Sequence, residues 1–225
     1  MSRNFQDALK KLKEKIFRMG LLVENAIDGA SIALFERDSA KAEEVIKNDQ
    51  EINIYEIEID ELAHELIALY QPTAIDMRFI SIVLKMTSDL ERMGDQAVNI
   101  AEKAIVVNQE PPLKPYEDLP TMARQTRLMV REALSAFMNE DAMKAKEIME
   151  RDDEVDRLNE KIYHEIHEHM KKKPDAICVG VSLIMVAHNF ERLADLATNI
   201  AEDIIYLKQG IDVRHHIRER RRESA

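Results

Sequence analysis

Residues 91–102 read ERMGDQAVNIAE, and residues 191–202 read ERLADLATNIAE. The two stretches lie one hundred positions apart and are identical at eight of twelve positions. Self-similarity at a fixed spacing indicates an internal duplication. The identical positions include acidic and amide residues as well as apolar ones. A duplication kept only for packing would preserve the apolar face alone, so the repeated polar face needs a further explanation.

Each stretch lies within a longer series of apolar residues that recur at alternating steps of three and four, with the same phase in both halves. This spacing is typical of a helix that packs along one face. We therefore predict a long helix in each half, with an apolar seam facing the inside of a helical bundle. The two series are Val83, Met86, Leu90, Met93, Ala97, Ile100 and Ala104, and Leu183, Val186, Phe190, Leu193, Ala197, Ile200 and Ile204.

The repeat extends well beyond these two helices. RDSAKAEEVIKNDQE, which starts at Arg37, matches NEDAMKAKEIMERDDE, which starts at Asn139, and Asp38 aligns with Asp141. The offset here is 103 rather than 100. The difference must lie in the connections near Pro72 and Pro174, because proline ends helices and loop length is tolerated.

These patterns predict an all-α protein of two tandem antiparallel three-helix bundles, related by internal duplication, with six long helices. Residues 1–110 form the first bundle. Residues 111–120, PPLKPYEDLP, contain four prolines and are predicted to be a linker. Residues 121–225 form the second bundle with a basic C-terminal tail. The bundles are expected to join end to end or side by side.

The composition limits the function. The 225-residue chain has a net charge of −11, which disfavours sequence-independent binding to nucleic acid and suits cations or basic partners. The N-terminal residues lack the apolar core of a signal peptide, and the longest apolar stretch is about half of the ~20 residues of a membrane span. We expect a cytoplasmic protein without direct membrane insertion. The single Cys178, within an apolar run, is predicted to be buried.

Oxygen-bearing side chains form a stripe on the repeated helix. At ~100° per residue, Glu91, Asp95, Asn99 and Glu102 fall on one side of the helical wheel, opposite the apolar seam. The preceding helix carries a companion stripe, Asp49, Asn53, Glu56 and Asp60. In the second half the corresponding stripes are Glu191, Asp195, Asn199 and Glu202, and Asp152, Asp156 and Asn159 followed by Tyr163.

Two facing acidic stripes repel each other, and a bound divalent or trivalent cation would remove that repulsion. Hard oxygen ligands suit Mg²⁺, Ca²⁺, Mn²⁺ or oxidised iron. Two alternatives remain at this point. The stripes are solvated acidic faces, or Arg92 and Arg192 neutralise the neighbouring carboxylates through salt bridges.

The sequence contains no pattern that supports an enzyme. Glu61 and His64 have the E-x-x-H spacing of di-iron bundles, but the second half does not repeat it. HEIHEH, residues 164–169, lacks the second histidine of H-E-x-x-H, because Glu168 stands there. No Gly-rich phosphate loop occurs, and Cys178 has no evident base nearby in the sequence.

The duplicated E-R-x-x-D-x-x-x-N-I-A-E stretches, with an Asp-rich helix before each, resemble the PhoU family of phosphate-uptake regulators. The resemblance covers about Phe5 to Leu207. It implies a cytoplasmic six-helix protein, often a homodimer, that acts with the phosphate ABC transporter and a membrane sensor histidine kinase. Such proteins restrain the phosphate-starvation response when phosphate is plentiful. Some members bind multinuclear iron or other metal clusters through paired E(D)-x-x-x-D motifs.

Carried onto this chain, the resemblance implies one cluster at Glu91 and Asp95 with Asp49, where Asn53 stands in place of the second acid. The other cluster has a complete acid set, namely Asp152, Asp156, Glu191 and Asp195. We therefore expect tighter metal binding in the second half.

The leading hypothesis is a non-enzymatic regulator that contacts the transporter ATPase subunit and the kinase and senses phosphate indirectly. The alternatives are a carboxylate-bridged metal enzyme or iron store, and a purely structural helical scaffold.

Overall fold

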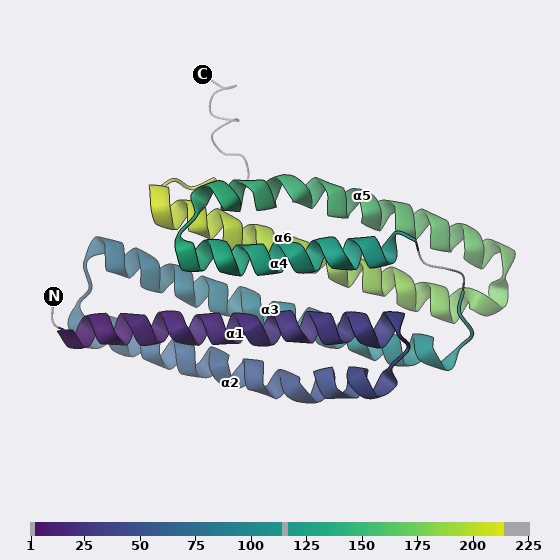
Figure 1. Ribbon diagram of the computed structural model, residues 1–225, viewed down its shortest axis with the longest axis horizontal. Coiled ribbons are helices and arrows are strands. Elements are labelled where there is room, and N and C mark those ends of the chain that lie inside the picture. Colours follow the sequence, from purple (N-terminus) through teal and green to yellow (C-terminus); the bar gives the residue numbers. More distant parts are fainter. Residues whose placement is uncertain (1–2, 114–116, 214–225) are drawn as a thin grey trace, which may run out of the picture.

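The computed structural model in Figure 1 describes residues 3–113 and 117–213. Within these ranges the chain forms six α-helices, one short 3₁₀ turn and no strand, which confirms the predicted all-α class with six helices. The helices are α1 (Arg3–Phe35), α2 (Ser39–Tyr70), α3 (Ala74–Gln109), α4 (Leu119–Asn139), α5 (Ala142–Lys172) and α6 (Ile177–Gln209), with the 3₁₀ turn at Pro174–Ala176.

The first three helices form one antiparallel bundle and the last three form the other, as the duplication predicts. The bundles lie side by side, with α3 packed against α6 and α1 against α4 (Figure 1). Their buried apolar residues belong to one continuous cluster. The two halves therefore share a single hydrophobic core, and each holds the helices of the other in position.

The helix starts repeat with the sequence. Asp38 precedes α2 and accepts a hydrogen bond from the backbone N–H of Lys41 at 3.0 Å. Asp141 precedes α5 and accepts from the N–H groups of Met143 and Lys144, both at 3.0 Å. Such N-caps satisfy donors that the first helical turn leaves free, so both second helices begin at a defined residue.

The linker prediction needs a correction at its C-terminal end. The structure places Leu119 and Pro120 in the first turn of α4, although the predicted linker ran to residue 120. Proline is tolerated in the first helical turn because its missing N–H has no intrahelical partner there. Residues 114–116 of the linker and residues 214–225, which contain the basic tail, lie outside the described residues.

The prediction that Cys178 is buried is wrong, because this side chain is exposed. The apolar run around it supplies α6 with a core face and also a partly exposed face that carries Ile177, Val181 and Met185. By length and composition alone, the segment Pro174–Gln209 qualifies as a possible membrane span, and half of its apolar window is buried in the bundle. A core helix of a soluble protein meets the same criterion.

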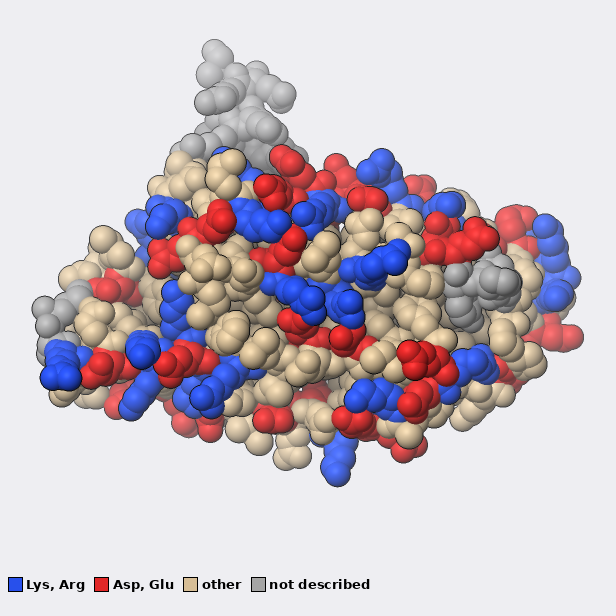
Figure 2. Space-filling view, viewed as in Figure 1, with Lys and Arg blue, Asp and Glu red and all other residues tan. Residues whose placement is uncertain are grey.

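Ion pairs join α1 to α4, and the positions that form them carry opposite charges in the two repeats. Arg127 pairs with Asp28, and Arg131 pairs with Glu24. At the repeat offset of 103, Glu24 aligns with Arg127 and Asp28 aligns with Arg131. The first repeat thus supplies both acids and the second supplies both arginines. Figure 2 shows acidic and basic side chains interleaved over this face of the molecule.

A third ion pair joins the bundles, and one of its two positions changes sign between the repeats, while Lys85 aligns with the uncharged Met185. Lys85 of α3 pairs with Asp203 of α6, and the residue aligned with Asp203 in the first repeat is Lys103. Pairing two copies of the same half would place like charges opposite each other. The charge pattern therefore favours contact between a first and a second bundle.

We predict that the double variant Glu24→Arg/Asp28→Arg lowers the melting temperature, because four cationic side chains then meet at the α1–α4 contact. Adding Arg127→Glu and Arg131→Glu should recover most of the loss. Thermal unfolding at low and high salt checks this, since salt should reduce the loss in the double variant.

The control for this prediction reverses the exposed pair within α1, Lys10→Glu with Glu14→Lys, and should leave the melting temperature unchanged. A fourfold variant no more stable than the double variant would contradict the pairing role.

Candidate functional site

Five oxygen-bearing side chains gather where α2 packs on α3, and we call them the first cluster: Asp49, Asn53 and Glu56 from α2, with Glu91 and Asp95 from α3. The Asn53 amide donates a hydrogen bond to Asp49 Oδ2 at 3.0 Å. A Cβ atom added at Gly94 would lie 3.1 Å from Asp49 Oδ1 and 3.0 Å from Ile52 Cδ1. Glycine at position 94 therefore lets α2 approach α3 closely beside this carboxylate.

Three carboxylates of the first cluster, Asp49, Glu56 and Glu91, have a raised pKa. Burial raises the pKa of Asp49 above its usual value, and the charge of Asp95 raises it further. Burial also raises the pKa of Glu91, with added repulsion from Asp95, Glu56 and Asp49. The hydrogen bond from Asn53 acts against this rise at Asp49, and the through-space charge of Arg92 acts against it at Glu91. The site thus holds negative charge that the surrounding protein only partly offsets.

The second cluster lies where α5 packs on α6 and consists of Asp152 and Asp156 from α5 with Glu191 and Asp195 from α6. Burial, followed by the charges of Asp195 and Asp156, raises the pKa of Asp152 to about 7. Burial likewise raises the pKa of Asp195, with a contribution from Asp156. At neutral pH, Asp152 is therefore divided between its protonated and ionised forms.

His188 adds a nitrogen to the second cluster. Its Nδ1 lies 2.9 Å from Glu191 Oε2, a distance that suits an ion pair when the ring is protonated. The same oxygen nevertheless has no hydrogen-bond partner, so the contact meets the distance of an ion pair but not the direction of a hydrogen bond. The corresponding position in the first half is Ser88, so only the second cluster has this neighbour.

Both clusters contain buried oxygens without a hydrogen-bond donor: Asp49 Oδ1 in the first, and Asp152 Oδ1 and Glu191 Oε2 in the second. Buried carboxylate oxygens usually have a donor or a cation, and these fit a hard cation by their chemistry. In the side-chain conformations of this structure, however, no three acidic, histidine or cysteine side chains of residues 3–113 and 117–213 converge on a point where one ion would be held. The clusters therefore supply oxygen ligands and negative charge for a cation, but they do not form a closed coordination shell in this structure.

The structure thus brings the eight predicted site residues together in two groups of four, one at each contact between the second and third helix of a bundle. Whether they bind metal stays a prediction. A place opposite the apolar seam predicts exposed side chains, but five of the eight are only partly accessible: Asp49, Asn53, Glu91, Asp152 and Glu191. The reason is that α3 and α6 each contact three helices, so their buried arc is wider than one seam and borders the acidic stripe.

The predicted alternative of arginine neutralisation is not what the structure shows. Arg92 and Arg192 are exposed, and within the described part of the chain neither forms an ion pair with a cluster carboxylate. Each lowers the pKa of its neighbouring glutamate only through space.

The sequence interpretation missed the role of Glu56. Asn53 was expected to leave the first cluster one acid short, but Glu56 lies close enough to raise the pKa of Glu91. At the offset of 103, Asn53 aligns with Asp156, and Glu56 aligns with Asn159. The acid and the amide have exchanged places one helical turn apart, so both clusters contain four carboxylates. The repeat alignment carried this signal.

Comparison with known proteins gives a consistent result over nearly the whole chain. The family model for the PhoU domain matches twice, at residues 16–104 and 119–204. A phosphate-specific transport system accessory protein PhoU homolog from Aquifex aeolicus is 43% identical over 213 residues, which cover 94% of this chain and 96% of that protein. The homolog from Pseudomonas putida is 37% identical over 216 residues, covering 96% of this chain and 84% of that protein.

Two solved structures share the fold. The crystal structure of PhoU from Pseudomonas aeruginosa superimposes with a TM-score of 0.90 at 36% identity, over 92% of this chain and all of that one. The phosphate transport system regulatory protein PhoU from Streptococcus pneumoniae gives a TM-score of 0.85 at 31% identity, over 93% of this chain and 99% of that one. The matched ranges include all residues of both clusters.

We predict that Asp152→Asn stabilises the metal-free protein above neutral pH. Because the folded pKa of Asp152 lies above the unfolded value, the folded state binds more protons between about pH 4 and about pH 7, and its stability falls as pH rises through that range. The asparagine variant lacks this loss. After solvent screening, its gain in unfolding free energy should be about 1–2 kcal/mol at about pH 8, and smaller at about pH 5.

Urea unfolding of chelator-treated protein at the two pH values measures this gain. Glu150→Gln, an exposed neutralisation on the same helix, is the matched control and should show no gain. A gain for Asp152→Asn that is equal at both pH values would show that the carboxylate is not destabilised by its surroundings.

Proposed function

The chain belongs to the PhoU family, and from this membership we propose that it is a non-enzymatic, cytoplasmic regulator of phosphate uptake and of the phosphate-starvation response. The support is whole-chain similarity to proteins named as accessory or regulatory components of phosphate transport. The matched ranges cover both repeats and contain the positions of both carboxylate clusters. This two-repeat agreement is the observation that carries the proposal.

The proposed partners are the ATPase subunit of the phosphate ABC transporter and a sensor histidine kinase. The shared core supports this role physically, because two bundles fused side by side present a rigid surface with two sets of exposed helices. Such a protein can contact two partners at once without folding on binding. Self-association into a homodimer is part of the proposal, and direct contact with nucleic acid is not.

The proposal includes iron or another divalent or trivalent metal ion at each cluster, in a multinuclear arrangement. Asp49, Glu56, Glu91 and Asp95 would hold it in the first half. A bound cation would supply positive charge that cancels the repulsion between α2 and α3, or between α5 and α6. The corresponding ligands in the second half are Asp152, Asp156, Glu191 and Asp195.

The carboxylates themselves explain how metal would affect regulation. Without a cation, repulsion across each helix pair opposes the packing of the second helix on the third. With a cation, that opposition is removed and the outer helices become stiffer. Metal content would therefore change the rigidity of the surface that α2 and α5 offer to a partner, while the shared core remains intact.

We predict that the chain restores repression in a bacterial strain that lacks its own PhoU and carries a phosphate-starvation reporter. In phosphate-rich medium the reporter should return to a low level, and in phosphate-poor medium it should remain high. Leu90→Asp is the negative control, because a charge at this fully buried position costs several kcal/mol and unfolds the protein. A reporter that stays high while the wild-type chain accumulates in soluble form would argue against the regulatory function.

Metal binding has its own prediction. The double variant Asp156→Asn/Asp195→Asn removes two of the four carboxylates of the second cluster and should abolish metal binding in that half. The total metal content of protein purified without chelator should therefore fall. Elemental analysis of the same sample reads this directly. Glu43→Gln/Glu61→Gln changes the charge equally at exposed α2 positions outside the clusters, and should retain the metal. Unchanged metal content in the first variant would end the idea of a second-half site.

A further inference from the structure

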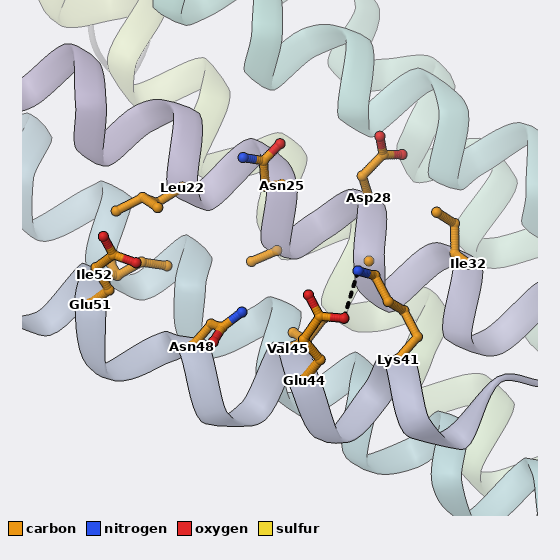
Figure 3. Close-up of a pocket in the computed structure, with 12 residues that line it drawn as sticks. Leu22, Asn25, Asp28, Ile32, Lys41, Glu44, Val45, Asn48, Glu51 and Ile52 are labelled. Atoms are coloured by element: carbon orange, nitrogen blue, oxygen red, sulfur yellow. Dashed lines mark hydrogen bonds and ion pairs between the residues drawn. The ribbon is translucent and has the colours of Figure 1, made fainter.

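A hollow of 370 Å³ lies between α1 and α2, and the α2 residues that line it lie outside the first cluster. Figure 3 shows Asn25 and Asp28 on α1 above it, and Asn48 on α2 below it. Its polar lining also includes Lys41, Glu44 and Glu51, and its apolar walls include Leu22, Ala26, Val45 and Ile52.

The second bundle shows what fills the matching position between α4 and α5. Arg151 of α5 donates a hydrogen bond to Glu132 of α4 at 2.6 Å, and Lys144 lies 3.0 Å from the other oxygen of Glu132. Next to them, Gln125 donates to Glu154 at 2.9 Å. Arg151 and Glu132 are both largely screened from solvent. A network of charged side chains therefore occupies this groove.

The repeat alignment shows which of these groups the first bundle lacks. Asn48 stands where the second repeat has Arg151, and Gly29 stands where it has Glu132. The space of the missing glutamate is already closed, since a Cβ atom at Gly29 would lie 2.7 Å from Val45 Cγ2. The space of the missing guanidinium beside Asn48 is open. Of the two missing groups, therefore, only the cationic one has open space in the hollow.

The charges around the hollow also favour a cationic ligand. Three carboxylates and one ammonium group line it. Lys41 Nζ lies 2.8 Å from Glu44 Oε2, and Asp28 is paired with Arg127. Glu51 has no ion-pair partner within the described part of the chain. The excess negative charge attracts a cation and disfavours an anion.

We propose that this groove between α1 and α2 binds an arginine side chain presented by a partner protein. The guanidinium takes the place that Arg151 occupies in the second bundle. The Glu51 carboxylate accepts hydrogen bonds from two N–H groups on one side of the planar guanidinium. The amide oxygens of Asn25 and Asn48 accept hydrogen bonds from its other N–H groups. The apolar walls contact the aliphatic part of the arginine. The groove thus gives the first bundle a docking point that the second bundle has filled with its own residues.

The test titrates the isotope-labelled full chain with Nα-acetyl-arginine amide and follows the backbone and side-chain amide signals by NMR. We expect saturable shifts centred on Asn25 and Asn48. Nα-acetyl-citrulline amide has nearly the same shape without the charge, and should give shifts at least about tenfold weaker at equal concentration. The binding is measured on purified protein, so its failure would leave the proposed regulatory function untouched.

Two matched pairs of variants locate the binding. Asn48→Arg fills the groove as the second repeat does and should abolish the saturable shifts, whereas Gln50→Arg adds the same charge on the opposite side of α2 and should preserve them. Glu51→Gln should weaken binding by about tenfold, whereas Glu61→Gln, an equal loss of charge outside the groove, should not. All four positions are exposed, so the variants should fold.

Three results would overturn the proposal. The arginine probe could shift signals over the whole acidic surface without saturating at the groove. The citrulline probe could bind equally well. Finally, Asn48→Arg could bind the arginine probe as tightly as Gln50→Arg does.

Discussion

The structure depends on apolar packing strong enough to hold like charges together. In each bundle, the buried face of the third helix brings a Glu-x-x-x-Asp pair against acidic residues of the second helix. In the first bundle, Gly94 permits the close approach that places Asp49 over the neighbouring backbone. The cost appears as raised pKa values and as buried oxygens without donors. The free energy of apolar packing outweighs a carboxylate repulsion that would separate an isolated pair of helices.

The duplication supplies two copies of this arrangement but does not leave them equivalent. Charges at the contact between bundles have opposite signs in the two repeats, so a first half pairs with a second half. The acid and the amide at positions 53 and 56 are exchanged at 156 and 159. A salt-bridged network fills the outer groove of the second bundle, and the same groove is hollow in the first. The shared core therefore supports two faces with different chemistry.

Much of the fold was predictable because its determinants are local. The seam spacing, the prolines at 72 and 174 and the repeat alignment predict six helices in two bundles. The missing information is tertiary. One helical wheel cannot reveal that α3 contacts α6 as well as its own bundle, so it placed Glu91 opposite the core, although that residue lies at its edge. The same reasoning wrongly predicted a buried Cys178, because an apolar run does not show which face of the helix packs against a neighbouring helix.

For the site, the positions of the residues were predictable, but the balance between their negative charges and the neutralising groups was not. Spacing alone placed Asp152, Asp156, Glu191 and Asp195 on facing stripes. It placed Glu56 on the companion stripe but not among the site residues, because the importance of this residue depends on its distance from Glu91 across two helices. Nor could it show that the exposed Arg92 forms no ion pair with a cluster carboxylate in the described part of the chain. Whether a charge is neutralised depends on side-chain directions that periodicity does not contain.

The central claim is that packing overrides carboxylate repulsion, and calorimetry of the chelator-treated wild-type chain tests it most directly. If the claim holds, the melting temperature falls between about pH 5 and about pH 8 as the clusters ionise, and added Mn²⁺ restores it at the higher pH. A melting temperature that rises or stays constant over this range, and does not respond to Mn²⁺, would contradict the account.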